Sequence, residues 1–146
     1  MNYYIDSVKP AEFPEVVDVW EASVRETHHF LKEEDILFYK PLILQEYLHA
    51  VDLRCVRDEE NNIVGFLGVA EGNIEMLFIH PDMRGKGIGT MLLHYAVEKL
   101  GSNKVDVNEE NKQAIGFYEH FGFRTISRSA FDSTGKPYPM LHMILT

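Results

Sequence analysis

The sequence predicts a single α/β domain over residues 1–146, in which helices cover a central mixed β-sheet. Three observations lead to this prediction. The length of 146 residues, 45% of them hydrophobic, suits one domain with one core that needs no metal or disulfide. The second half alternates short apolar segments with amphipathic helical ones, which favours locally parallel strand pairing. The first half contains two strand-like segments around a polar turn at residues 58–62, which predicts a hairpin.

The first half is expected to begin with a short strand around residues 3–8. Pro10 and Pro14 follow at the opening of a helix, where proline costs least, and apolar residues then recur at helical spacing as far as Thr27. A second helix is expected over residues 33–49, and Pro41 should kink or divide it.

The remaining elements follow from apolar periodicity and from turn residues. The expected order is strands at 53–57, 63–69 and 74–79, a helix at 87–100, a strand at 104–107, a helix at 111–121, and strands at 123–128 and 140–145.

Composition excludes several classes of function. Asp and Glu outnumber Lys and Arg by 23 to 14, and the net charge of −9 repels nucleic acids and anionic membranes. The single Cys55 excludes an internal disulfide, and no histidine pattern has metal-ligand spacing, so no metal site is expected. We see neither a signal peptide nor an apolar run long enough to span a bilayer, so a cytoplasmic protein is expected, either monomeric or homodimeric.

The most informative local pattern is the glycine-rich segment at residues 84–90, Arg-Gly-Lys-Gly-Ile-Gly-Thr. It follows an apolar strand and opens an amphipathic helix, so its glycines let the backbone approach a ligand closely. The free amides and positive dipole end of such a helix favour a phosphate. The segment matches neither the P-loop nor the dinucleotide-binding pattern, and a turn that binds nothing is the alternative.

Three motifs follow one another in the second half: Arg84-x-x-Gly87-x-Gly89, Asn108-x-x-Asn111 and Ala114-x-x-Phe117-Tyr118. In this order they resemble the pyrophosphate signature, the fifth strand and the following helix of the Gcn5-related N-acetyltransferases (GNAT). The stretches at residues 23–31, 107–111 and 135–139 resemble the bacterial YjaB-type branch of that family.

The resemblance implies a fold in which the fourth and fifth strands splay into a V that holds acetyl-CoA, whose pantetheine arm pairs with the strand edge. The implied coenzyme A site consists of Leu77, Phe78, Ile79, Arg84, Gly85, Lys86, Gly87, Ile88, Gly89, Thr90, Asn108, Asn111, Ala114, Phe117 and Tyr118. The implied reaction is acetyl transfer to a primary amine of a small molecule, peptide or protein, by direct attack in a ternary complex.

Acetyl transfer to an amine needs a proton donor for the departing thiolate and a base for the amine. The family's matching tyrosine serves as the acid, which implies that role for Tyr118; a core tyrosine beneath Phe123 is the alternative. A phenol of pKa ~10 donates uphill to a thiolate whose acid has pKa ~8.5, at a cost of about 2 kcal/mol. Glu75 is the candidate base, and strict alternation places it on the strand face opposite Met76. His80 and the pair His28-His29 are further candidate bases.

The acceptor pocket is expected between the first two helices and the last hairpin. Candidate acceptor-contacting residues are His28, His29, Phe30, Asp35, Tyr39 and Tyr138, and capping or packing roles are as plausible for each. A catalytically silent CoA-binding regulatory module is the alternative function. An enzyme that acetylates aminoacyl-tRNA is disfavoured because RNA binding calls for a basic surface.

Overall fold

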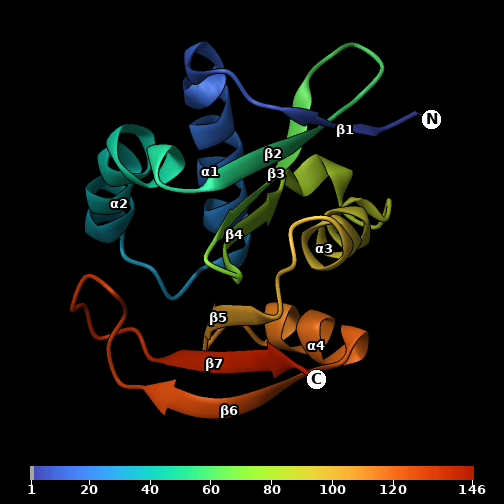
Figure 1. The fold of residues 1–146 in the computed structure, drawn as a ribbon. Helices are drawn as coiled ribbons and strands as arrows, with labels where there is room; N and C mark the ends of the chain where they lie inside the picture. Colours follow the sequence, from blue (N-terminus) through green and yellow to red (C-terminus); the bar gives the residue numbers. More distant parts are fainter. Residues whose placement is uncertain (1) are drawn as a thin grey trace.

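A seven-stranded mixed sheet forms the centre of the protein, as the sequence predicted (Figure 1). The computed structural model describes residues 2–146. Its strand order is β1-β2-β3-β4-β5-β7-β6. The strands are β1 Tyr4–Ser7, β2 Asp52–Arg57, β3 Ile63–Ala70, β4 Asn73–Ile79, β5 Lys104–Asn108, β6 Phe123–Ser129 and β7 Met140–Leu145. Among the described strands, only β4 and β5 pair in parallel. The parallel pairing expected for the second half extends no further, because β7 lies between β5 and β6 and is antiparallel to both.

Within residues 2–146, four α-helices and three 3₁₀ turns connect these strands. They are η1 Pro10–Glu12, α1 Phe13–Thr27, α2 Glu33–Gln45, η2 Tyr47–His49, η3 Pro81–Met83, α3 Ile88–Glu98 and α4 Lys112–Phe121. The helix expected over 33–49 continues through Pro41 and is divided at Glu46, whose φ of −126° and ψ of −57° leave the helical region. Within the described chain, no helix is both long and apolar enough to cross a membrane.

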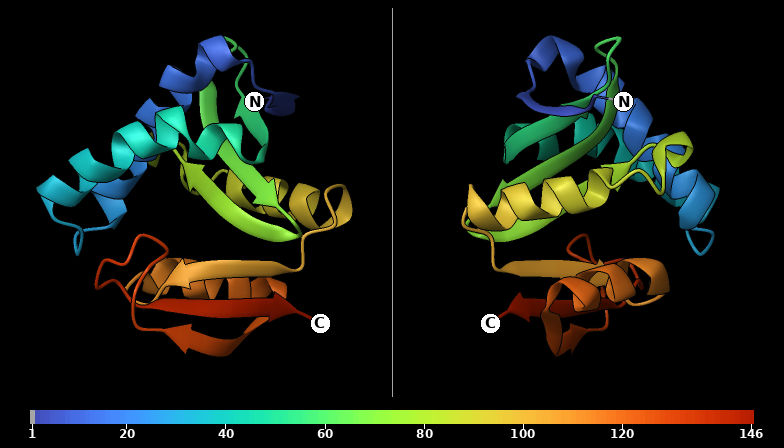
Figure 2. Two further views of the ribbon diagram at one scale, coloured as in Figure 1. Left: turned by 60° about the vertical axis from the view of Figure 1, so that its left-hand side comes forward. Right: turned by 90° about the vertical axis from the view of Figure 1, so that its right-hand side faces the viewer.

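The helices cover the sheet on both faces (Figure 2). On one face, α1 and α2 pack against β2, β3 and β4, with Trp20 and Phe66 among the buried side chains. On the other face, α3 and α4 form a second core that includes Leu92 and Val105. Burying a large apolar side chain of this kind contributes about 1.5–3 kcal/mol, so both faces stabilise the sheet.

The fourth and fifth strands part, which confirms the expected V. They pair only through Asn73 with Lys104 and Ile74 with Val105, and beyond these pairs β4 runs on without β5 (Figure 2). The parting starts at a β-bulge: β3 pairs Gly68 with Met76 and the next residue with Ile74, which leaves Glu75 out of register. A bulge bends a strand and increases its twist, so it helps to turn β4 away from β5.

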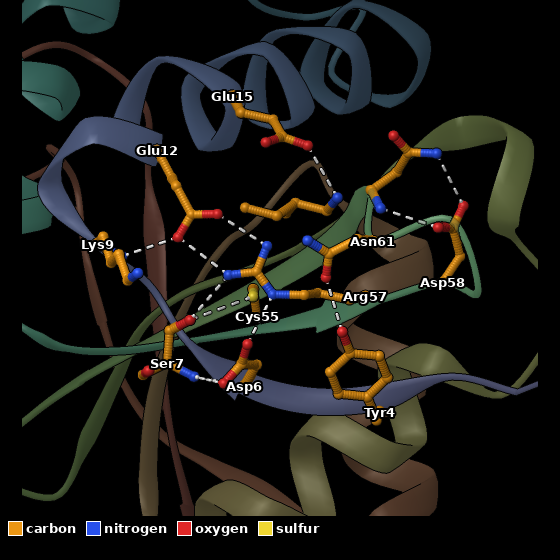
Figure 3. Close-up of polar contacts among 12 residues, drawn as sticks. Tyr4, Asp6, Ser7, Lys9, Glu12, Glu15, Cys55, Arg57, Asp58 and Asn61 are labelled. Atoms are coloured by element: carbon orange, nitrogen blue, oxygen red, sulfur yellow. Dashed lines mark hydrogen bonds and ion pairs between the residues drawn. The ribbon is translucent and has the colours of Figure 1, made fainter.

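A buried arginine fixes the N-terminal strand to the sheet (Figure 3). Arg57 is 4% exposed; it donates from Nε to Asp6 Oδ2 and from Nη1 to Glu12 Oε2, each at 2.8 Å. Its Nη2 donates to the Ser7 carbonyl oxygen at 3.1 Å. The guanidinium lowers the pKa of both carboxyls, through hydrogen bonds above all. Because a buried charge is tolerated only when it is paired, this cluster holds β1 and η1 in place and so sets where α1 begins.

Candidate active site

A first cavity of about 330 Å³ lies where β4, the turn before α3, and α4 meet. Thirteen of the residues expected to bind coenzyme A line it, namely Leu77, Phe78, Ile79, Arg84, Gly85, Gly87, Ile88, Gly89, Thr90, Asn111, Ala114, Phe117 and Tyr118. The other two lie elsewhere: Lys86 borders a separate hollow beside Asp82, and Asn108 lines the second cavity described below.

The start of α3 borders this cavity and has the geometry expected of an anion cradle. Gly85 and Gly87 have φ angles of +76° and +80°, a left-handed conformation that glycine adopts without steric cost. Gly87 is the N-cap residue and supplies no side-chain cap, so the first helical amides stay available to a ligand. A Cβ built on either glycine would meet no atom within 4 Å and would project into open space. The cradle therefore fits a diphosphate bound by main-chain amides.

A second cavity of about 260 Å³ lies on the other side of the parted strands. Its walls include α1, α2 and the loop before β7, the elements expected for an acceptor pocket, together with β4, β5 and α4, which were not expected there. His28, Tyr39, Glu75 and Tyr138 line it. Of the other expected acceptor residues, His29 is exposed, whereas Phe30 packs against His28 and Tyr138 with ring centroids 5.1 and 6.2 Å away; neither of them lines this cavity.

Two tyrosine–carboxylate pairs hold the loop at residues 130–139 against α2. Tyr39 of α2 donates to Asp132 of the loop, and Tyr138 of the loop donates to Asp35 of α2. Asp35 is buried and also pairs with Lys136 at 3.0 Å, and the hydrogen bond from Tyr138 is the main cause of its lowered pKa. Asp35 therefore supports the wall of the second cavity without lining it.

The two cavities share six lining residues, which form the seam between them: His28, Leu77, Phe78, Asn111, Ala114 and Tyr118. Tyr118 is 6% exposed, and its ring packs edge-on against Phe117 and Phe123, with centroids 5.2 and 5.5 Å away. The ring therefore packs in the core, as the alternative interpretation expected, and the residue also borders both cavities. Burial raises the pKa of Tyr118 well above its ordinary value, so proton donation costs more than the sequence estimate.

His28 and Asn111 touch each other at the seam. Asn111 Oδ1 caps α4 by accepting the amide of Ala114 at 3.2 Å, and Asn111 Nδ2 lies 3.4 Å from His28 Nε2. Burial lowers the pKa of His28 to about 4, with the positive charge of Arg84 as a second cause. His28 is therefore neutral at pH 7.

Glu75 sits at the bulge of β4 and is exposed. Ile74 packs in the core under α3 and α4, whereas Met76 packs in the core under α1 and α2, so the simple alternation assumed from sequence is broken here. The bulge leaves Glu75 along the second cavity. His80, another candidate base, instead caps η3, where its Nδ1 accepts a hydrogen bond from the amide of Asp82 at 3.2 Å.

Sequence reasoning missed several cavity-lining residues. Ser23, Met83 and Gln113 line the first cavity, and Trp20, Val24, Ile43 and Tyr47 line the second. The apolar ones follow the same helical periodicity as core residues, so periodicity alone cannot separate a cavity wall from a core. The spacing of four between Ser23 and Thr27 does place both on one face of α1, and this was the available signal.

Comparison with known proteins identifies the family. Residues 52–125 match the model of the acetyltransferase (GNAT) domain. The chain is 36% identical over 133 residues to the peptidyl-lysine N-acetyltransferase YjaB of Salmonella typhimurium, covering 91% of each chain. The protein belongs to the GNAT acetyltransferase family. It is an acetyl-CoA-dependent N-acetyltransferase, as the resemblance in its motifs implied.

Further relatives agree with this membership. The Escherichia coli peptidyl-lysine N-acetyltransferase YjaB is 37% identical over 132 residues, which is 90% of this chain and 89% of that protein. The solution structure of apo YjaB from E. coli aligns with a TM-score of 0.89 over 100% of this chain and 99% of that one, at 35% identity. The PaiA N-acetyltransferase of Thermoplasma acidophilum, crystallised with coenzyme A, shares the fold with a TM-score of 0.75 at 18% identity and full coverage of both chains. None of these relatives supports the silent CoA-binding alternative.

Proposed function

We propose that this GNAT enzyme acetylates the ε-amine of lysine residues in a peptide or protein. The observation that carries the proposal is the pair of cavities that meet at Tyr118, one with an anion cradle and one with an acidic lining. The charged residues that line the second cavity are all carboxylates, namely Glu75, Asp106 and Asp132, which suits a cationic acceptor. The YjaB relatives, named as peptidyl-lysine enzymes, agree with this acceptor.

Hydrogen bonding positions the Asp106 carboxylate at the second cavity, where a cationic acceptor would bind. His142 Nδ1 lies 2.6 Å from Asp106 Oδ1, and Ser129 Oγ lies 2.6 Å from His142 Nε2. Since a carboxylate only accepts hydrogen bonds, the imidazole Nδ1 donates to Asp106. This hydrogen bond holds the Asp106 side chain in place beside the second cavity.

In the proposed reaction, main-chain amides after Arg84 bind the diphosphate of acetyl-CoA, and the thioester reaches the seam from the first cavity. The lysine amine enters from the second cavity and attacks the acetyl carbonyl directly. Glu75 removes the amine's proton and Tyr118 donates one to the departing thiolate. A lysine amine of pKa ~10.4 is about one part in 2,500 neutral at pH 7, at a cost of ~4.6 kcal/mol, so a base matters for this acceptor. Acetyl-CoA use and a single reduced cysteine are both expected of a cytosolic enzyme.

The test is acetylation of matched peptides followed by mass spectrometry. A lysine peptide with a blocked N-terminus should gain one acetyl group, and the same peptide with Lys replaced by Arg should gain none. Glu75→Gln should slow the reaction at pH 7 more than at pH 9, because the amine is more often neutral at high pH. Acetylation confined to free N-termini or small amines would overturn the lysine assignment.

A further inference from the structure

His28 occupies a position that neither acid nor base assignment uses. It is one of six residues that line both cavities, so it stands where the thioester and the amine must meet. Three of the six carry polar side chains: Tyr118 is the assigned acid and Asn111 is engaged as the cap of α4. The role of the third, His28, follows from the direction of its hydrogen bonds.

The hydrogen bonds around His28 fix which ring nitrogen carries the proton. Thr27 Oγ1 lies 2.7 Å from the Ser23 carbonyl oxygen and 2.7 Å from His28 Nδ1. The carbonyl can only accept, so the single threonine hydroxyl proton goes to Ser23. Thr27 Oγ1 must then accept from His28, which places the imidazole proton on Nδ1.

The other side of the ring leads to the same tautomer. Asn111 Oδ1 accepts the amide of Ala114, so the amide nitrogen Nδ2, and not the oxygen, faces His28 Nε2. An amide nitrogen only donates, so Nε2 presents a lone pair. The contact is 3.4 Å long, at the weak end of hydrogen-bond distances, so a stronger donor can replace it.

We propose that His28 Nε2 accepts a hydrogen bond from the attacking amine and so orients the amine's lone pair toward the acetyl carbonyl. The proposal rests on the acetyl transfer given above and adds a residue to it. As the C–N bond forms, the nitrogen becomes positive and its N–H groups become stronger donors. The bond to His28 therefore strengthens in the transition state, which is the condition for raising kcat.

His28 holds the amine without taking its proton. Desolvation and the nearby charges of Arg84 and His29 lower the pKa of the ring to about 4, so the neutral form persists at working pH. The contact between the rings of His28 and Phe78, with centroids 6.2 Å apart, helps to fix the ring plane. The proton itself leaves through Glu75, as proposed above.

The tautomer can be observed directly by ¹⁵N NMR of the histidine side chains. The account predicts that His28 carries its proton on Nδ1 and has a bare Nε2, the less common form of free histidine. A ring protonated on Nε2 would overturn the proposal, because no lone pair would then face the seam.

The kinetic test compares three variants of His28 with a neighbouring control. His28→Gln keeps an acceptor oxygen near the Nε2 position, whereas His28→Asn keeps a donor toward Thr27 but is too short to reach the seam. We expect kcat to fall 10- to 100-fold in His28→Asn and His28→Leu, to stay within about fivefold in His28→Gln, and not to change in His29→Asn. Coenzyme A affinity, measured by calorimetry, should stay within twofold in all four.

Two kinetic results would overturn the role: an unchanged kcat in His28→Asn, or an equal loss in the Gln, Asn and Leu variants. Failure of the proposed acceptor is distinguishable, because the wild type would then leave lysine peptides unmodified while acetylating another amine. The same variant series, run with that amine, still tests His28.

Discussion

The half-buried, neutral state of His28 predicts how the stability of the protein depends on pH. The pKa of His28 is about 4 in the folded protein, against an ordinary 6.5, because burial disfavours the charged ring. The unfolded chain therefore binds this proton more tightly than the folded chain. The contribution of His28 to stability is intact above pH 6.5 and is lost as the pH falls from 6.5 toward 4.

The size of the effect follows from the two pKa values. A difference between 6.5 and about 4 corresponds to about 3 kcal/mol once the pH has fallen to 4. Other groups titrate in the same range, so the relevant quantity is the difference between wild type and His28→Gln, which lacks this proton. The variant should lose about 3 kcal/mol less than the wild type between pH 7 and pH 4.

Chemical denaturation followed by tryptophan fluorescence can measure this difference, because Trp20, the single tryptophan, is buried in the core under α1 and α2. Gly116→Ala, which adds a side chain in open space on α4 and changes no titratable group, serves as the control and should run parallel to the wild type. Parallel stability curves for wild type and His28→Gln would show that His28 is not held neutral, and the reasoning would fail.

Three further substitutions, one of them paired with a control, test other parts of the account. Tyr118→Phe should lower kcat about 100-fold or more, measured as thiol release, with coenzyme A affinity nearly unchanged; an unaffected kcat would exclude the tyrosine as acid. Gly65→Ala should lower the free energy of unfolding by about 1–3 kcal/mol, because the new Cβ would lie 3.2 Å from the Phe78 carbonyl oxygen. Its control is Gly116→Ala, which lies in open space on α4 and should leave the stability unchanged or raise it. Asp35→Ala removes the hydrogen-bond partner of Tyr138, so it should speed amide hydrogen exchange at residues 130–139. It should also raise the KM for the acceptor but not the KM for acetyl-CoA. Unchanged exchange would show that the tyrosine–carboxylate pairs do not hold the loop.

Local patterns predicted most of the fold because periodicity and turn residues act over short distances. The glycine-rich turn, the amphipathic α3 and the asparagine that caps α4 are all features of neighbouring residues. Their order along the chain carried the family resemblance and with it the parted strands. The end of α2 was misplaced because Pro41 is accommodated within the helix, and the break comes at Glu46 instead.

The missing details of the site depend on contacts between distant residues. The bulge that leaves Glu75 along the second cavity is a property of the pairing between β3 and β4, and alternation within one strand cannot show it. The pairs that join α2 to the loop before β7 link residues about 100 positions apart. The proton position on His28 likewise requires both Thr27 and Asn111 to be placed around it.

The central claim is that main-chain amides after Arg84 bind the diphosphate of acetyl-CoA and so direct its thioester to the seam. The most direct test is an NMR titration of the backbone amides with acetyl-CoA and, separately, with S-acetylpantetheine, which has the thioester arm but no diphosphate. The account predicts that acetyl-CoA shifts the amides of Gly85 to Thr90 as well as those of Leu77 to Ile79. S-acetylpantetheine should bind far more weakly and leave the glycine turn unchanged. Equal affinity for the two compounds, or an undisturbed turn with acetyl-CoA bound, would contradict the account.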